Sequence, residues 1–205
     1  MHWRLPPCVH CRHGFGEASC AALVEEMLSA VLYCHQHGVV HRDIKLDNFM
    51  FRDETDSSAL TLIDFGYACA VQRGAETMRF NCGTPSYMAP ELLGHAASGY
   101  DSSVDVWALG VVVFMLLSGT RPWYAADLKE RGRMIREEPL LFEGARWEHV
   151  SCAAKDFISC LLQKEPGRRL SARDALSHEW LQQSRLHGAD SVQETSEHAE
   201  IVQAL

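Results

Sequence analysis

The sequence predicts a mainly α-helical domain with one short β-hairpin, and three features support this fold class. Apolar side chains recur at helical spacing over residues 24–35. Residues 104–117 are apolar nearly all round, which is typical of a helix buried in the middle of a domain. Two short apolar runs, residues 49–51 and 60–63, are separated by the polar residues 53–58, and this pattern indicates a hairpin.

The first predicted helix begins at Glu17 and ends before Gly38. The preceding residues 1–13 contain two adjacent prolines and no periodic pattern, so we expect an irregular segment there. Glycine directly after the last periodic residue is a usual helix stop. One face of this helix carries its apolar side chains and one histidine, namely Val24, Met27, Leu28, Val31, Leu32 and His35.

The second half of the chain predicts a long loop followed by helices. Residues 65–86 are polar and rich in Gly, Arg and Thr, and a loop of that length in a domain is usually functional. After the apolar helix, a shorter charged helix is predicted over residues 127–136. Ser151 is placed to cap the next helix, and Ser171 to open a last packed helix that runs to about Leu181.

Composition excludes several classes of partner. The 205 residues are 47% hydrophobic and 22% charged, which suits one domain or one lobe of a two-lobed protein. A net charge of −8 argues against nucleic acids and anionic membranes as partners. No secretory signal is visible, and the apolar run 104–117 is too short to span a bilayer, so the cytoplasm is the default location. Residues 182–205 are polar, and we expect a frayed helix or disorder there.

The eight cysteines favour free, buried thiols over a disulfide framework, because the chain shows no export signal. Cys8 and Cys11 have the spacing of half a zinc site. No second pair of the same kind completes that site, so we interpret these residues as part of the irregular segment.

Three short motifs occur in a fixed order. Residues 41–48 read HRDIKLDN, residues 64–66 read DFG and residues 88–91 read MAPE. Each motif alone is a weak signal, since a single Asp is more often a solvated carboxylate. Together they resemble the catalytic loop, the magnesium loop and the end of the activation segment of protein kinases. The resemblance covers about residues 14–181. It implies the protein-kinase-like α+β fold, here as the mainly α-helical C-terminal lobe with a short β-hairpin and with the N-terminal β lobe absent.

The resemblance implies a role for each polar residue of these motifs. Asp43 accepts or orients the proton of the substrate hydroxyl, and Lys45 neutralises charge on the transferred phosphate. Asn48 and Asp64 offer oxygen ligands to magnesium, which prefers hard donors. Thr84 resembles the threonine that hydrogen-bonds the catalytic Asp and Lys in serine/threonine kinases. The implied cofactors are ATP and Mg²⁺, and the implied partners are proteins that carry Ser or Thr acceptors.

Other residues match supporting positions of the family. His41 is expected to pack under the loop that contains Phe65 and Gly66. Arg42 is expected to pair with a phosphate on the activation segment, in a charge-assisted and bidentate contact. Thr77 is either that phosphorylation site or a plain loop residue.

Three charged residues resemble those that tie the lobe of a kinase together. Glu91 and Arg169 match the buried ion pair of the family. Asp105 matches the residue that holds the backbone of the catalytic loop from the buried helix. A carboxylate in so apolar a helix needs a hydrogen-bonding partner, because unpaired burial of a charge is costly.

Four later segments narrow the resemblance. Residues 147–151, 154–158, 165–172 and 178–181 are similar to calcium- and calmodulin-regulated kinases, and most similar to calcium-dependent kinases with fused EF-hands. No EF-hand loop occurs in the sequence, so a calcium-binding regulator would be a separate partner. The departures from the family pattern are mild replacements of Pro, Glu and Asp at Leu46, Asp47 and Glu165.

Two functions of different class follow. In the first, the chain is the C-terminal lobe of a serine/threonine kinase, which the intact Asp43, Lys45, Asn48 and Asp64 favour. In the second, the lobe is inactive and serves as a protein-binding module. The second is favoured by the expected absence of the N-terminal lobe, since the Gly-rich loop, strand lysine and helix glutamate of kinases do not occur in the sequence. The first function would then require the missing N-terminal lobe, and we expect the start of the kinase to have been lost from this sequence.

Overall fold

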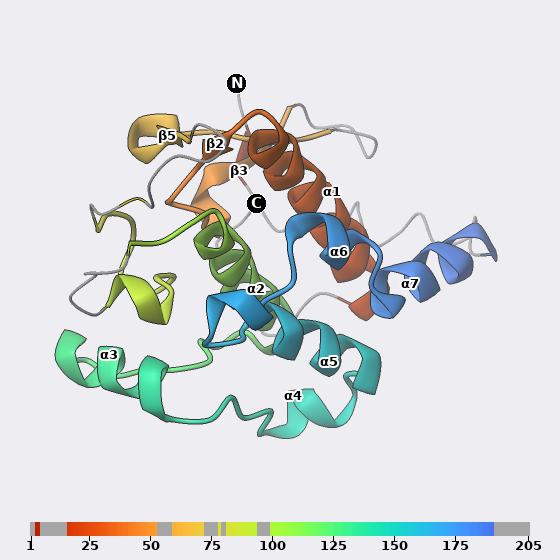
Figure 1. Ribbon diagram of the computed structural model, residues 1–205. Helices are drawn as coiled ribbons and strands as arrows, with labels where there is room; N and C mark the ends of the chain where they lie inside the picture. The colour runs from red at the N-terminus through yellow and green to blue at the C-terminus, as the bar shows by residue number, and fades with distance from the viewer. Residues whose placement is uncertain are drawn as a thin grey trace.

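The structure is a computed structural model that is mainly α-helical (Figure 1). It describes residues 3–4, 16–52, 59–71, 78, 81–93 and 99–190. Short strands join the helices, and no helix of this described part is long and apolar enough to cross a membrane. The predicted fold class, a helical domain with a short hairpin, agrees with this architecture.

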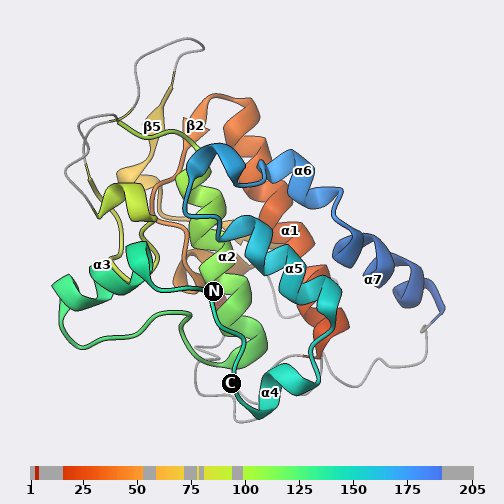
Figure 2. The same cartoon turned by 60° about the horizontal axis from the view of Figure 1, so that its bottom comes forward.

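Helix α2 (Ser103–Ser118) forms the centre of the core. Every residue from 104 to 118 is buried, as the continuous apolar run predicts. Helix α2 packs against α1 (Glu17–Gln36) and against α5 (Cys152–Leu161), and the two views show it in the middle of the helical part (Figures 1 and 2). Gly119 ends α2 with a φ of 72°, a left-handed conformation that glycine adopts without steric cost.

Helix α1 has the predicted extent, and Gly38 follows its end. The φ of Gly38 is +69°, and a Cβ atom at this position would lie 2.8 Å from the carbonyl oxygen of Val71. Only glycine therefore fits at the turn that leads from α1 into residues 41–48, which we call the catalytic motif. The apolar face of α1 packs on the core through six positions that the helical period predicts or extends, Cys20, Val24, Met27, Leu28, Val31 and Cys34.

The predicted cap at Ser151 is confirmed, and a further cap that the sequence did not predict lies at Asp127. The side chain of Asp127 accepts a hydrogen bond from the backbone of Glu130 at the start of α3 (Leu128–Glu137). Ser151 does the same for Ala154 at the start of α5. A four-residue helix, α4 (Ala145–Glu148), lies between them and was not predicted, because it is too short to show a period.

The last predicted helix is instead two helices. Ser171 caps α6 (Ala172–Leu176) through the backbone N–H of Asp174, and α7 (Glu179–Asp190) begins three residues after α6 ends. The break lies at His178, whose Nδ1 accepts a hydrogen bond from the backbone N–H of Trp180 at 3.2 Å. This side-chain cap competes with a continuous helix, and the helical period alone does not reveal it.

Within the described residues, five short strands form two small sheets. In the first sheet, β3 (Phe49–Phe51) pairs antiparallel with β4 (Leu60–Leu62), which confirms the hairpin, and β1 (Trp3–Arg4) pairs with the other edge of β3. In the second, β2 (Val39–Val40) pairs with β5 (Cys69–Ala70). The sequence predicts neither β1 in the irregular segment nor β5 in the long loop, because two-residue strands carry no pattern and form where a backbone edge needs partners.

At Gly110, helix α2 lies very close to α5. A Cβ atom at Gly110 would lie 2.9 Å from the Cβ of Leu161 and 2.9 Å from a methyl of Leu162. Gly110→Ala should therefore destabilise the fold by about 1–3 kcal/mol, although alanine is the better helix former. Gly167→Ala is the matched control, because a Cβ there meets nothing within 4 Å. Urea unfolding followed by circular dichroism checks both variants, and equal midpoints would contradict the prediction.

Candidate active site

The carboxylate of Asp105 fixes the start of the catalytic motif. Asp105 lies on the buried helix α2 and is itself buried. Its Oδ2 accepts a hydrogen bond from the backbone N–H of His41 at 2.8 Å, and its Oδ1 accepts one from the backbone N–H of Arg42 at 2.8 Å. The ring of His35, on α1, lies 2.9 Å from the same Oδ2. Four polar groups thus meet where α1, α2 and the motif converge, and the burial of this charge is compensated.

Asp43 is buried, and its carboxylate is fully hydrogen-bonded. Oδ1 accepts from the backbone N–H of Thr84 at 2.9 Å and from its hydroxyl at 2.7 Å. Oδ2 accepts from Nζ of Lys45 at 2.6 Å and from Nδ2 of Asn48 at 3.3 Å. Lys45 also donates to the hydroxyl of Thr84 at 3.3 Å. The structure therefore brings together four of the predicted site residues, and they come from two segments 41 residues apart.

The protonation of Asp43 is set by two opposing effects. Burial raises the pKa of its carboxyl, while the hydrogen bonds from Lys45 and Thr84 and the positive charge of Lys45 lower it. The second effect is larger, so the pKa of Asp43 lies below its ordinary value and the group is ionised at neutral pH.

Asn48 and Asp64 lie at the same end of the β3–β4 hairpin. The backbone N–H of Ile63 donates to the carbonyl oxygen of Asn48 at 2.9 Å, and Asp64 follows directly. Nδ2 of Asn48 is engaged with Asp43, whereas its Oδ1 has no hydrogen-bond partner among the described residues. Asp64 is exposed, and its only side-chain contact in the described part is a 3.3 Å bond from the N–H of Gly66 to Oδ1. Free amide and carboxylate oxygens fit a magnesium ion.

His41 joins the catalytic motif to the DFG motif. Its Nε2 lies 3.0 Å from the carbonyl oxygen of Ile63, and its ring contacts the ring of Phe65 edge-on with centroids 4.8 Å apart. Gly66 lies in the one-turn helix Phe65–Tyr67 that follows. Asp64 has a φ of +63°, an unusual value for a residue other than glycine, which turns the chain sharply at this point.

Arg42 contacts the beginning of the activation segment and Tyr100, which lies just before α2. Its Nε donates to the carbonyl oxygen of Tyr67 at 2.6 Å, and its Nη1 donates to the hydroxyl of Tyr100 at 3.1 Å. Its φ is +66°. Thr77, the predicted phosphorylation site, lies outside the described residues, as do Cys8 and Cys11.

Glu91 and Arg169 form the predicted ion pair, at 2.8 Å and 3.2 Å in a bidentate contact. The side chain of Arg169 is completely buried, and it also donates to the carbonyl oxygens of Gln163 and Ser103. Its guanidinium carbon lies 5.1 Å from the ring centre of Trp107. This arginine therefore ties the end of the activation segment to α2 and to the turn before α6.

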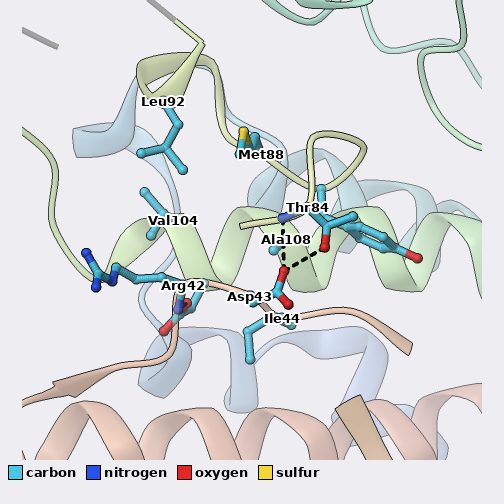
Figure 3. Close-up of a pocket in the computed structure, with 10 residues that line it drawn as sticks. Arg42, Asp43, Ile44, Thr84, Met88, Leu92, Val104 and Ala108 are labelled. Atoms are coloured by element: carbon cyan, nitrogen blue, oxygen red, sulfur yellow. Dashed lines mark hydrogen bonds between the residues drawn. The ribbon is translucent and has the colours of Figure 1, made fainter. Parts of the chain in front are cut away.

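A small pocket lies between the catalytic motif, the activation segment and α2 (Figure 3). The figure shows Asp43 pointing to Thr84, with Val104 and Ala108 of α2 behind them. The pocket holds about 10 Å³, which is room for about one water molecule and far too little for a nucleotide. A nucleotide would therefore have to bind outside this pocket, on the outer side of Asp43.

One other cluster has the composition of a metal site. Asp156, Cys160 and His178 place their ligand atoms within 4.8 Å of one another. Nδ1 of His178 accepts the N–H of Trp180, so in the neutral ring Nε2 carries the proton and donates to Asp156 at 3.2 Å. Neither nitrogen then offers a lone pair to a metal, and this cluster is a helix cap.

Sequence reasoning missed His35, Tyr67 and Tyr100 as partners of the site. His35 shares the apolar face of α1, and that position is the only signal that could have indicated its buried contact with Asp105. Tyr67 contributes a backbone oxygen, which no sequence pattern reveals.

Asp105→Asn should loosen the catalytic motif. The side-chain amide of asparagine keeps one acceptor oxygen, but its NH₂ group faces a backbone N–H where the second carboxylate oxygen was. One of the two buried backbone N–H groups therefore loses its acceptor. We expect a loss of about 1–3 kcal/mol in the free energy of unfolding. Faster hydrogen exchange at the amides of His41 and Arg42 should accompany it. The control is Asp101→Asn, an exposed carboxylate that bonds only the N–H of Ser103 among the described groups. Unchanged exchange at both amides would contradict the role given to Asp105.

Comparisons with known proteins agree with this geometry. The protein kinase domain family matches residues 5–181. A serine/threonine-protein kinase H1 homolog from Pinctada fucata is 40% identical over 168 residues, which are 82% of this chain and 40% of that protein. Calcium/calmodulin-dependent protein kinase type I from Schizosaccharomyces pombe is 40% identical over 172 residues, covering 83% and 51%. Calcium-dependent protein kinase 8 from Arabidopsis thaliana is 37% identical over 174 residues, covering 85% and 32%.

The chain thus spans about a third to a half of the length of these relatives. The family match covers most of the chain and includes all three motifs and the Asp105 and Arg169 positions. The chain belongs to the protein kinase family, and it is similar to serine/threonine kinases of the group that contains the calcium/calmodulin-dependent kinases.

Proposed function

We propose that this chain carries three parts of an active serine/threonine kinase. They are the catalytic loop, the magnesium loop and the turn with Thr84 and Ser86 that faces the substrate. In this reaction a Ser or Thr oxygen of a protein forms a bond to the γ-phosphorus of ATP, and the bond from that phosphorus to the bridging oxygen breaks. The observation that carries the proposal is the carboxylate of Asp43, which Lys45 and Thr84 hold by three short contacts.

Asp43 orients the substrate hydroxyl in this proposal. A carboxylate whose pKa is lowered is a weak base, so it accepts a hydrogen bond from the hydroxyl and takes the proton only late in the transfer. All four acceptor positions of Asp43 are occupied, and the longest bond is the one from Asn48 at 3.3 Å. The incoming hydroxyl displaces that bond at least cost, because Asn48 keeps its 2.8 Å bond to the backbone oxygen of Asp43.

Lys45 and the two oxygen donors act on the phosphate side. Lys45 lies 2.6 Å from Asp43 and is partly exposed, so its charge reaches a phosphate that faces the acceptor oxygen. Asn48 and Asp64 would hold Mg²⁺, which neutralises charge on the phosphates when bound. Residues outside this sequence would supply the Gly-rich loop and the strand lysine that complete the ATP site, either on the same protein or on a partner.

A phosphotransfer assay tests the proposal. The 205-residue chain, supplied with the residues that complete the ATP site, is incubated with labelled ATP, Mg²⁺ and a serine-containing protein, and compared with Asp43→Ala. We expect transfer by the wild type that Asp43→Ala reduces by about 10²–10⁴-fold, because the hydroxyl loses its acceptor. Thermal unfolding of both proteins separates loss of activity from loss of fold. A wild-type rate equal to that of Asp43→Ala would contradict the proposal, because it is the result expected of an inactive binding module.

The lowered pKa of Asp43 also predicts how stability depends on pH. A carboxylate whose folded pKa lies below its ordinary value of 3.8 stabilises the fold above that pH and ceases to do so as the pH falls through the folded pKa. The difference in unfolding free energy between wild type and Asp43→Asn should therefore be constant above about pH 5 and shrink below about pH 4. Urea titrations between pH 2.5 and pH 7 (about ten conditions) measure it. A difference that persists undiminished at the lowest pH would contradict the assignment.

A further inference from the structure

Two arginines of α3 face the segment that carries Thr84. Arg131 donates from Nη1 to the hydroxyl of Ser86 at 2.9 Å, and Arg136 donates from Nη1 to the carbonyl oxygen of Leu93 at 3.1 Å. Both contacts cross from α3 to the end of the activation segment.

The guanidinium of Arg131 is held in a fixed position. Nε and Nη2 both donate to the carbonyl oxygen of Ala125, at 3.0 Å and 2.6 Å, and the group lies 5.8 Å from the ring centre of Tyr124. With the bond to Ser86, three of its five N–H groups have acceptors among the described residues. The remaining two are available to an acceptor from outside.

Arg131 has no anionic partner in the described part of the chain. Its neighbour on α3, Arg133, contacts the carboxylates of three residues at 2.8–3.2 Å, which are Glu130, Glu137 and Glu138. Arg131 is half-buried, yet all of its hydrogen bonds go to neutral oxygens. A half-buried cation with free donors and neutral partners is a site to which a carboxylate can bind by charge-assisted hydrogen bonds.

The position of Arg131 relative to Asp43 indicates where that carboxylate comes from. Thr84 bonds Asp43, and the backbone N–H of Tyr87 donates to the carbonyl oxygen of Thr84 at 2.9 Å, which closes a turn that contains Ser86. Arg131 contacts this turn directly. A protein whose acceptor hydroxyl lies at Asp43 must pass its neighbouring residues over the same turn, within reach of a long side chain from the guanidinium.

We infer that Arg131 is a specificity-determining residue that binds an acidic side chain of the substrate next to the acceptor Ser or Thr. The inference rests on the proposed kinase function and adds a substrate class to it. Arg136 lies farther along the segment and extends the positive charge in the same direction. Substrates with Asp or Glu on the side of the acceptor that faces the turn are then preferred over neutral ones.

Peptide binding to the complete 205-residue chain tests the inference without needing catalysis. Two fluorescent serine peptides share two arginines before the serine and differ after it, where one has three Glu and the other three Gln. Fluorescence anisotropy at low salt gives the ratio of their dissociation constants. We expect the Glu peptide to bind about fivefold more tightly to the wild type. Arg131→Gln should reduce this ratio to about one, since glutamine keeps N–H donors but has no charge.

Two further variants make the result specific. Arg133→Gln removes a cation of the same helix that already has carboxylate partners, and it should keep the wild-type ratio. Ser86→Ala removes the internal acceptor of Arg131 and should keep or increase the ratio. Circular dichroism of each variant confirms that it is folded.

The outcomes separate the two proposals. A ratio that survives in Arg131→Gln, or that is lost in Ser86→Ala while Arg131 is intact, overturns the role of Arg131. Equal binding of both peptides by the wild type also overturns it but leaves the kinase function standing. If neither peptide binds the wild type, the proposed protein-substrate function of this chain fails, and the inference fails with it.

Discussion

The hydrogen bonds from Asp105 to two backbone N–H groups are the constraint on which the site depends. They attach the start of the catalytic loop to the most buried helix of the protein, α2, so the loop inherits the rigidity of the core. A buried carboxylate without hydrogen-bond partners would be very costly, and the N–H groups of the loop supply those partners. In return, the carboxylate on the helix fixes the orientation of the loop. The position of Asp43, two residues after His41, follows from this attachment.

The second level of organisation connects the catalytic loop to the activation segment. Thr84 contacts Asp43, and the end of the same segment is fastened at Glu91, which pairs with the buried Arg169. Arg131 fastens the intervening turn at Ser86. A change at either fastening point, far along the sequence from Asp43, therefore acts on the acceptor geometry at Asp43. In the proposed function, the same segment therefore serves both the chemistry and the recognition of the substrate.

Much of the fold could be predicted from the sequence, because the pattern of apolar residues is clearest in the elements that are most buried. The continuous apolar run predicted α2. The two short apolar runs with a polar turn between them predicted the β3–β4 hairpin. The two-residue strands β2 and β5 and the break at His178 could not be predicted, since they depend on partners far along the chain or on a single cap. The resemblance of the motifs to those of protein kinases predicted that Asp43, Lys45, Asn48 and Thr84 would act together. It did not predict the contact of His35 with Asp105 or that of Arg131 with Ser86, because both join helices to loops by one side chain.

The positive φ angles of Arg42 and Asp64 have a consequence for how the site behaves as a whole. Each residue sits in a backbone conformation that costs about 1–3 kcal/mol outside glycine, and each lies beside a residue of the proposed chemistry. The Asp105 bonds to the backbone oppose relaxation at Arg42, and the His41 contacts with Ile63 and Phe65 oppose it at Asp64. These contacts hold the strain in place, so the loss of either one would let the backbone relax away from the geometry of the proposed site.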